Sequence, residues 1–251
     1  MRRIDQRQLN ELIRREFLMM PLRPSTMTFY TVRTSILRSV ERETASFHGS
    51  VLDIGCGFMP YRTMIEGVES VQKYTGMDLE QSAYSNNVEP HLKWDGHSIP
   101  TSDESFDCVI ATELLEHCAR PESVLTEIYR VLKPGGKFFA TVPFIWNLHE
   151  IPHDEYRYTP FSLERHLSCV GFGAISVKPL GGWNMALAQM LGLWLGFSRM
   201  HRATRAILRI LLFPIYALLV LTDLIPDGFD GNENSMFSGL SVLARKENAV
   251  P

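Results

Sequence analysis

The sequence predicts an α/β protein in which helices flank a mostly parallel β-sheet. Two observations lead to this fold class. From residue 50 onward, short apolar segments alternate with amphipathic ones, and each apolar segment has the length of a buried strand. Glycine and proline lie between the segments, as they do in successive βαβ units.

Residues 1–49 are expected to form N-terminal helices. Apolar side chains recur there at helical spacing, first at Leu9, Leu12, Ile13 and Phe17, and again at Val32, Ile36, Leu37 and Val40. The stretch from Pro21 to Pro24 separates the two groups. We therefore expect two helices before the sheet begins.

The first four strands are expected at residues 51–54, 73–77, 106–111 and 136–142. Residues 121–132 carry apolar side chains on one side and predict a helix, which ends at Lys133–Gly136 because proline and glycine begin a turn there. A helix over residues 161–167 and two more strands, at 174–177 and 240–244, follow.

The composition indicates one globular domain with a substantial core, since 45% of the 251 residues are hydrophobic and 21% are charged. The net charge of −3 provides no basic field for nucleic acid, which favours small-molecule chemistry. No CxxC pair occurs, and the N-terminus is charged without an apolar signal core. These features predict free thiols and a cytoplasmic protein.

A glycine turn follows the first strand and is the first candidate for a ligand site. Gly55 and Gly57 allow a ligand to approach the backbone closely, because neither has a Cβ. Asp53, at the end of the strand, is expected either to hold the turn or to reach the ligand through water. A tight strand-to-helix turn without a ligand remains the alternative for this motif alone.

Two acidic residues further along strengthen the ligand interpretation. Asp78 lies about 20 residues beyond the glycine turn, at the end of the next strand, where a carboxylate accepts both ribose hydroxyls. Asp95 is expected to accept from an adenine amino group while Gly96 donates to the ring, although a solvated loop acid explains Asp95 equally well. The chain has Phe58-Met59-Pro60 where a dinucleotide site needs a third glycine, so an adenosine ligand without a diphosphate fits better.

The motifs VLDIGCG, YTGMDL, WDG, SFDCVIATELLEH and EIYRVLKPGGKFFATVP occur in this order, and the chain thereby resembles class I S-adenosylmethionine-dependent methyltransferases related to ubiquinone and menaquinone biosynthesis enzymes. Residues 55–62 have the pattern GCGxxPYR, and in this respect the chain resembles those members of the group that often accompany surface-glycan genes. The resemblance spans residues 50–183 and, more weakly, 236–246. It implies a Rossmann-like, seven-stranded, mostly parallel sheet and S-adenosyl-L-methionine as cofactor. The cofactor contacts that it implies are Asp53, Gly55, Cys56, Gly57, Asp78, Leu79, Asp95 and Gly96, with Thr112 and Glu113 beside the methionine portion.

Candidates for acceptor chemistry are concentrated in residues 142–158, which follow the end of a strand, on the usual ligand side of an α/β sheet. His153 and His149 are the candidate general bases, and Asp154 could orient either of them. Tyr156 and Arg157 could bind a polar or anionic acceptor. The alternative is that this stretch only caps and anchors the next helix.

His117 is expected to be a structural residue near the cofactor, on the helix after the 106–111 strand. No HxxxH pair falls on a predicted helix, so the sequence gives no support for a metal site.

An apolar helical insert is expected before the last strand. An uncharged apolar run in it, residues 210–221, is about half of the length that a membrane-spanning helix needs. A single crossing would also separate the last strand from its sheet. Basic residues before this run suit an anionic membrane surface or a lipid-linked substrate, and a helical cap or a homodimer face through residues 183–226 is the equal alternative.

The expected organisation is therefore N-terminal helices at 1–49, the cofactor-binding core at 50–182, the insert at 183–235 and the final strand and tail at 236–251. The leading hypothesis is methyl transfer to a small or lipid-linked acceptor, such as a sugar hydroxyl, by a cytoplasmic enzyme that is free or peripheral on the inner face of the membrane. The main alternative is a non-catalytic module with the same fold that acts as a membrane-associated partner, and a weaker one is an NAD-dependent epimerase or reductase.

Overall fold

The computed structural model describes residues 5–80, 87–223 and 235–247. Both chain ends and residues 224–234, the last part of the predicted insert, lie outside the described residues. The main helices are α1 Gln6–Ile13, α2 Tyr30–Thr44, α3 Arg62–Glu66, α4 Pro121–Val131, α5 Pro160–Val170, α6 Trp183–Phe197 and α7 Arg202–Leu221. Three shorter helical turns are η1 Arg14–Leu18, η2 Pro24–Thr26 and η3 Leu115–His117.

The strands form one seven-stranded sheet in the order β3-β2-β1-β4-β5-β7-β6. Their bounds are β1 Gly49–Ile54, β2 Val71–Leu79, β3 Leu92–Trp94, β4 Phe106–Thr112, β5 Leu132–Pro143, β6 Phe172–Leu180 and β7 Gly239–Lys246. β7 runs antiparallel to both β5 and β6, and the pairs from β3 to β5 are parallel. The predicted Rossmann-like, mostly parallel fold is confirmed.

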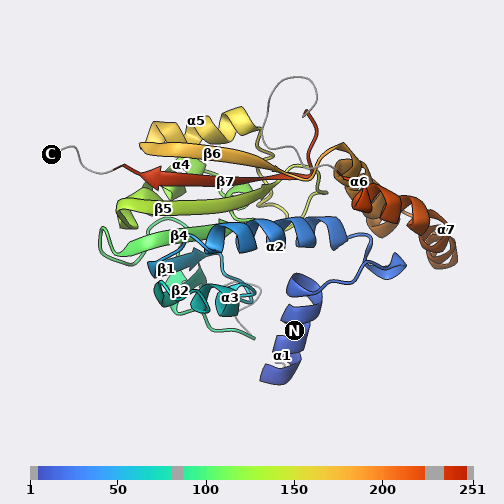
Figure 1. Ribbon diagram of the computed structural model, residues 1–251, viewed down its shortest axis with the longest axis horizontal. Coiled ribbons are helices and arrows are strands. Elements are labelled where there is room, and N and C mark those ends of the chain that lie inside the picture. The colour runs from blue at the N-terminus through green and yellow to red at the C-terminus, as the bar shows by residue number, and fades with distance from the viewer. Residues whose placement is uncertain (1–4, 81–86, 224–234, 248–251) are drawn as a thin grey trace.

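Helices cover both faces of the sheet, as Figure 1 shows. On one face α2 and α3 pack through Ile36, Val40 and Ile65. On the other face α4 and α5 pack through apolar residues such as Leu125 and Leu163. Because successive strand residues point to opposite faces, each central strand supplies side chains to both cores, which explains its largely apolar sequence.

Local sequence signals set several helix boundaries. The side chain of Thr159 accepts the Ser162 amide, Pro160 occupies the first turn, and α5 ends at Gly171 with a φ of 109°. Pro121 likewise opens α4. The prediction of a turn at Lys133–Gly136 is wrong. β5 begins at Leu132, directly after α4, and these residues form the irregular first part of this strand.

The strand β3 was not among the predicted strands. It has three residues, of which Trp94 is buried, so it is too short to show an alternating pattern. β3 extends the sheet beyond β2 through the pair Leu79 and Trp94. Because β3 ends at Trp94, Asp95 lies directly after a strand end, beside the end of β2.

The insert forms a pair of contacting helices, α6 and α7, at the end of the molecule where β6 finishes (Figure 1). Residues 27 and 28 hold this pair to the rest of the chain. A Cβ on Gly192 of α6 would lie 2.1 Å from the Met27 carbonyl oxygen, and Tyr216 of α7 donates a 2.9 Å hydrogen bond to the same oxygen. The helix pair therefore packs on the segment before α2 through its inner side.

Candidate functional site

The glycine turn lies at the carboxyl end of β1, in the middle of the sheet. Gly55 and Gly57 have φ values of 70° and 50°, in the left-handed region that glycine favours. The amides of Gly55 and Cys56 donate to the Met77 carbonyl oxygen over 2.8 and 3.1 Å, which fixes the turn against β2. Met59 has a φ of 52°, so it holds the left-handed conformation at the position where the related motif has its third glycine.

Asp78 lies beside this turn, as the sequence predicts. Its Oδ2 accepts a 3.1 Å hydrogen bond from the Gly57 amide, and its Oδ1 accepts the Leu79 amide over 2.8 Å. These contacts hold the carboxylate at the end of β2, next to the backbone bend. An adenosine lying over Gly55 and Gly57 would bring its ribose to this carboxylate.

Leu79, Asp95 and Gly96 lie at the neighbouring strand end. Leu79 pairs with Trp94, and the Glu80 amide donates to the Trp94 carbonyl, so Asp95 follows directly beside β2. Asp95 is exposed, and its Oδ1 accepts the amides of His97 and Ser98 over 2.8 Å each. These hydrogen bonds lower the pKa of Asp95 and orient its carboxylate within the loop.

Asp53 lies beneath the turn and is 2% exposed. Its Oδ2 accepts a 2.5 Å hydrogen bond from the Tyr74 hydroxyl of the adjacent strand β2. Burial raises the pKa of Asp53 to about 7. This hydrogen bond ties the end of β1 to β2, and both roles that the sequence leaves open for Asp53, holding the turn and reaching the ligand through water, stay predictions.

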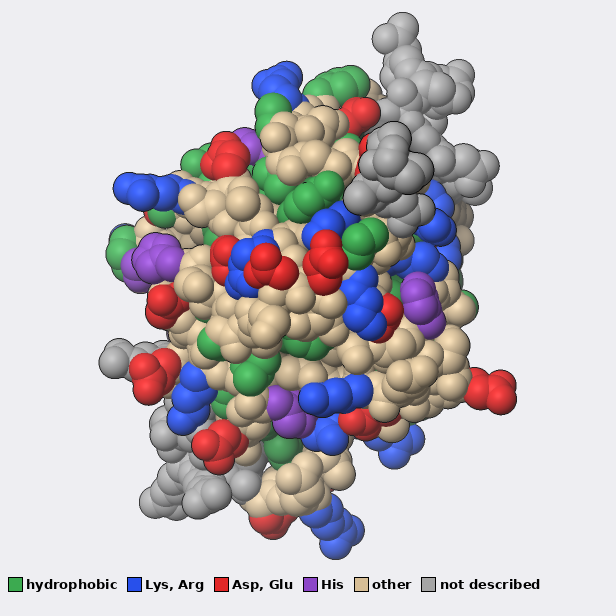
Figure 2. Space-filling view, turned by 90° about the vertical axis from the view of Figure 1, so that its left-hand side faces the viewer, with side chains coloured by type: hydrophobic (Ala, Val, Ile, Leu, Met, Phe, Trp, Pro, Cys, Tyr) green, Lys and Arg blue, Asp and Glu red, His purple; other side chains and the backbone are tan. Residues whose placement is uncertain are grey.

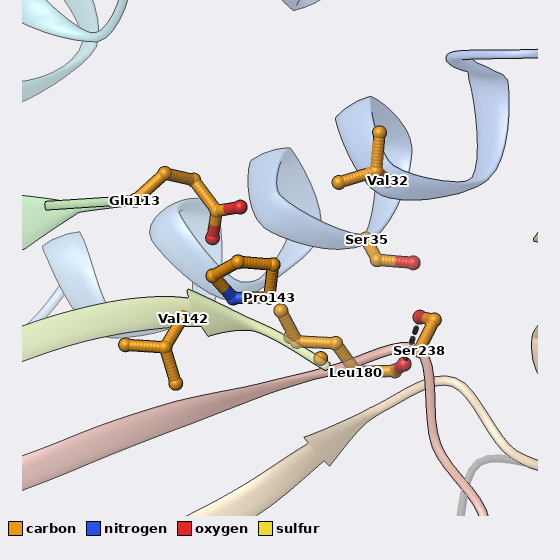
Figure 3. Close-up of a pocket in the computed structure, with 8 residues that line it drawn as sticks. Val32, Ser35, Glu113, Val142, Pro143, Leu180 and Ser238 are labelled. Carbon is orange, nitrogen blue, oxygen red and sulfur yellow. Dashed lines mark hydrogen bonds between the residues drawn. The ribbon is translucent and has the colours of Figure 1, made fainter. Parts of the chain in front are cut away.

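Thr112 ends β4 and Glu113 follows it, at the same edge of the sheet. Glu113 has a φ of 52°, its amide donates to the Thr141 carbonyl, and its Oε1 accepts the Thr141 hydroxyl over 2.9 Å. Its carboxylate lines a small pocket between α2 and the ends of β5, β6 and β7, shown in Figure 3 with Ser35 and Ser238. Burial raises the pKa of Glu113 to about 7, so this group changes charge near neutrality.

The loop after β5 brings together three of the predicted acceptor-side residues. His149 Nδ1 lies 3.1 Å from Asp154 Oδ2, and Arg157 binds both oxygens of Asp154 over 2.6 and 2.8 Å. The guanidinium of Arg157 lowers the pKa of Asp154 below its usual range. A carboxylate accepts only, so it fixes the proton on Nδ1 of neutral His149 and leaves the lone pair on Nε2.

His153 and Tyr156 lie apart from this pairing. The His153 side chain is exposed, and its carbonyl oxygen lies 2.9 Å from Nδ1 of His117. Tyr156 stacks on Tyr158 at 5.5 Å and donates a 3.4 Å hydrogen bond to the Ala119 carbonyl. The structure therefore joins Asp154 to His149 rather than to His153.

Glu116 and His117 also belong to this cluster. They lie on the short helix η3 after β4, and their side chains lie close to that of His149. The rings of His117 and His149 are 4.7 Å apart between centroids. The adjacent glutamate and histidine were visible in the sequence, but their meeting with the later loop was not.

An aromatic group connects this loop to the helical insert. Trp146 lies 6.4 Å from His149, 5.8 Å from Phe29 and 6.4 Å from Phe197 at the end of α6, between ring centroids. Phe29 and Phe197 are 6.3 Å apart. These contacts form a continuous aromatic path from α6 to the candidate base.

The strand order, with the candidate cofactor residues at the carboxyl ends of β3, β2 and β1, is that of an α/β protein of the nucleotide-binding type. Residues 52–140 match the family model described as a methyltransferase domain. The chain therefore contains a methyltransferase domain, with the fold of class I S-adenosylmethionine-dependent methyltransferases.

Curated relatives and a solved structure are consistent with this assignment. The chain is 26% identical over 193 residues to the ubiquinone/menaquinone biosynthesis C-methyltransferase UbiE of Bartonella henselae, covering 60% of this chain and 73% of that protein. It is 31% identical over 98 residues to a fatty-acid O-methyltransferase of Mycolicibacterium smegmatis, covering 36% of each protein, so the match spans about a third of that relative. A SAM-dependent methyltransferase from Archaeoglobus fulgidus superposes with a TM-score of 0.52 at 14% identity, over 86% of this chain and 94% of that one.

Proposed function

We propose that this chain transfers the methyl group of S-adenosyl-L-methionine to a hydroxyl of a lipid-linked acceptor at a membrane surface. The observation that carries the acceptor class is the aromatic path from His149 through Trp146 to Phe197 on α6. It joins the candidate base to an exposed apolar surface. The relatives named for fatty-acid and quinone substrates support an apolar acceptor.

The cofactor half of the proposal uses the residues at the strand ends. Asp78 would accept the ribose hydroxyls, Asp95 and Gly96 would face the adenine, and Thr112 and Glu113 would lie beside the methionine portion. Leu79 is 47% exposed beside Gly96 and would cover an apolar face of the adenine. Gly55, Cys56 and Gly57 would leave room for the ligand above the turn.

The transfer itself is a direct displacement. The acceptor oxygen forms a bond to the methyl carbon while the bond between carbon and sulfur breaks, and S-adenosylhomocysteine leaves. The hydroxyl proton must go to a base, and Nε2 of His149 carries the required lone pair. Asp154 positions His149, Arg157 holds Asp154, and Tyr156 would contact the acceptor at the rim of the loop.

The surface of the helical insert supports the membrane part of the proposal. Large apolar side chains are exposed on both helices, at Trp183, Leu187, Met190, Trp194 and Phe197 on α6 and at Ile207, Ile210, Leu211, Ile215, Leu218 and Leu221 on α7. The end of the molecule opposite these helices carries intermixed acidic and basic side chains, with hydrophobic side chains in small separate groups (Figure 2). An apolar surface of this extent is typical of an interaction site.

Basic side chains lie where α6 turns into α7. Arg199, His201 and Arg202 are exposed, whereas Arg205 and Arg209 bond inward to the Ser198 carbonyl and the Thr28 hydroxyl. Exposed cations next to exposed apolar and tryptophan side chains suit the phosphates and acyl chains of an anionic leaflet. This charge arrangement favours a membrane over a second copy of the chain, whose insert would carry the same positive charge.

Among the described residues, α7 is long and apolar enough to cross a membrane, with a mean hydropathy of 1.9. A crossing is incompatible with the fold, because Tyr216 in α7 is bound to Met27 and β7 rejoins the sheet between β5 and β6. We therefore place α6 and α7 in the membrane interface, with the protein peripheral on the cytoplasmic leaflet.

The test compares two acceptors that share one hydroxyl-bearing head group, octyl glucoside and free glucose, with tritiated S-adenosyl-L-methionine and anionic vesicles. The proposal expects label on octyl glucoside well above the no-enzyme rate and at least tenfold above glucose. It also expects flotation with anionic vesicles, lost in a Trp194→Ser/Leu218→Ser variant and retained in a Leu148→Ser variant, which changes an exposed apolar residue elsewhere.

Equal labelling of both sugars would refute the lipid-linked class. Vesicle flotation and cofactor binding without turnover on octyl glucoside, fatty acids or quinols would favour the non-catalytic module instead.

A further inference from the structure

Three potential metal ligands meet where η3 faces the loop after β5. Glu116, His117 and His149 each offer one ligand atom, and these atoms all lie within 4.8 Å of one another. Glu116 and His117 are adjacent in sequence, and His149 comes from the loop more than thirty residues later. The sequence alone gives no metal motif here, because the fold creates the grouping.

The carboxylate of Glu116 is the first sign that a ligand belongs in this cluster. Its side chain has no exposed surface, and neither oxygen has a hydrogen-bond partner among the described residues. Oε1 faces Nε2 of His117 at 3.7 Å, which is beyond hydrogen-bonding distance. A buried carboxylate without a partner is costly, and a bound cation would remove that cost.

The two histidines are held in the form that binds metals. His117 Nδ1 lies 2.9 Å from the His153 carbonyl oxygen, which can only accept, so the proton is on Nδ1 and the lone pair is on Nε2. Asp154 fixes His149 in the same tautomer. A carboxylate or carbonyl bonded to the distal nitrogen is the usual outer partner of a metal-binding histidine.

The backbone around the three side chains is well fixed. The Glu116 carbonyl oxygen accepts the amides of Glu155 and Tyr156 over 2.8 and 3.2 Å, and the Tyr158 hydroxyl donates to the Leu115 carbonyl. These bonds tie η3 to the loop that carries His149. The ligand set is therefore held together by the fold and does not depend on a chance side-chain contact.

We infer that Glu116, His117 and His149 bind a divalent transition-metal ion such as Zn²⁺. Two imidazole nitrogens and one carboxylate oxygen are a ligand set that suits Zn²⁺, and Co²⁺ and Ni²⁺ accept it as well. Ligands of tetrahedral Zn²⁺ are about 3.4 Å apart. The 3.7 Å separation of Glu116 and His117 nearly fits, and no pair in the group is more than 4.8 Å apart, so only a small closure is needed. Glu150, with Oε2 3.9 Å from His117 Nε2 and its side chain exposed, stands at the open side as a further oxygen ligand.

This inference rests on the geometry of the cluster and not on the proposed methyl transfer. A bound ion would take the lone pair of His149 that proton acceptance needs. Metal binding and the proposed base function therefore compete for one atom. Regulation is the one part that rests on the proposed function: a transition metal bound here would block transfer to a hydroxyl.

The test is titration of the full chain with Zn²⁺ by calorimetry, and with Co²⁺ by visible absorption, in the absence of cofactor. We expect one equivalent of each metal to bind, with a Co²⁺ spectrum that has no thiolate charge-transfer band. Glu116→Gln and His117→Gln should each weaken binding by at least tenfold. Asp154→Asn, which removes the outer partner of His149, should weaken it by about 10- to 100-fold.

His48→Gln is the matched control, since His48 is exposed and precedes β1, at the end of that strand away from the cluster. It should bind both metals as the unchanged chain does. Thermal unfolding of each metal-free variant checks folding, and if Glu116→Gln is unfolded, His117→Gln decides the outcome. Absence of stoichiometric binding, or equal affinity in folded Glu116→Gln, His117→Gln and control variants, would overturn the inference.

Discussion

The Nδ1 atom of His149 lies 3.1 Å from Oδ2 of Asp154, and the same oxygen accepts the backbone amide of His149. This double contact fixes both the tautomer and the direction of the imidazole. Because Arg157 neutralises Asp154, the pair carries an ionised carboxylate that remains charged well below neutral pH. It resembles a base and its orienting group more closely than any other pair in the predicted loop.

Replacing His149 by Gln should lower kcat for a hydroxyl acceptor by about 100- to 10,000-fold, which is the usual contribution of a general base. The Kd for S-adenosyl-L-methionine should stay within about twofold, because His149 is assigned to the acceptor side. His153→Gln is the comparison and should retain most of the activity, since only the backbone of His153 contacts the cluster. If His153→Gln is the inactive variant, the assignment of the base is wrong.

Zn²⁺ should inhibit transfer to a hydroxyl acceptor, because the ion and the proton compete for Nε2 of His149. Steady-state rates measured with increasing Zn²⁺ should fall, and addition of a chelator should restore them. Glu116→Gln should shift the inhibition to at least tenfold higher Zn²⁺. Stimulation by Zn²⁺ would contradict the base role of His149 and leave it as a metal ligand.

The stability of the fold should fall between pH 5 and pH 8 because Asp53 and Glu113 resist ionisation. Burial raises the pKa of both groups to about 7. An acid with a raised pKa contributes stability that is complete below its unfolded-state pKa, near 4, and is lost as the pH rises through about 7. For Asp53 the loss over this interval is on the order of 2–3 kcal/mol.

Thermal unfolding at a series of pH values checks this prediction. Asp53→Asn should flatten the decline, while Asp95→Asn, which changes an exposed carboxylate, should leave it in place. A wild-type protein that is as stable at pH 8 as at pH 5 would show that Asp53 ionises freely.

Gly55→Ala should destabilise the turn and weaken cofactor binding. An added Cβ would require a side chain at a φ of 70° and would lie 2.9 Å from Leu114 Cδ1. The backbone term alone costs about 1–2 kcal/mol. Chemical unfolding should show this loss of stability. The double variant Gly55→Ala/Leu114→Ala should remove the clash with Leu114 but keep the backbone cost. Full recovery of stability in the double variant would therefore contradict the conformational argument.

The sequence predicted the sheet well because its central strands are buried on both faces. The segments at 51–54, 106–111 and 136–142 are short, largely apolar runs between amphipathic segments, which is the pattern of buried parallel strands. The sequence did not predict β3, because three residues with one buried side chain are too few to show the alternating pattern of a strand. The turn predicted before β5 became an irregular strand start, because neighbouring β4 offers pairing from Phe106 onward.

The cofactor side of the site was more predictable than the acceptor side. Gly57 and Asp78 follow consecutive parallel strands, so the topology alone brings them together. The loop over residues 144–159 has no regular geometry, and no spacing rule distinguishes His149 from His153 as the partner of Asp154. The same irregular loop brings His149 next to Glu116, so the sequence does not predict this contact either.

The central claim is that Asp78 and the glycine turn hold the adenosine of S-adenosyl-L-methionine, and calorimetric titration of Asp78→Ala with this cofactor tests it most directly. Glu80→Ala, an exposed carboxylate two residues further on, is the matched control. We predict that the unchanged chain and Glu80→Ala bind one equivalent with the same Kd, while folded Asp78→Ala binds at least 100-fold more weakly. An unchanged affinity in folded Asp78→Ala would contradict the assigned site.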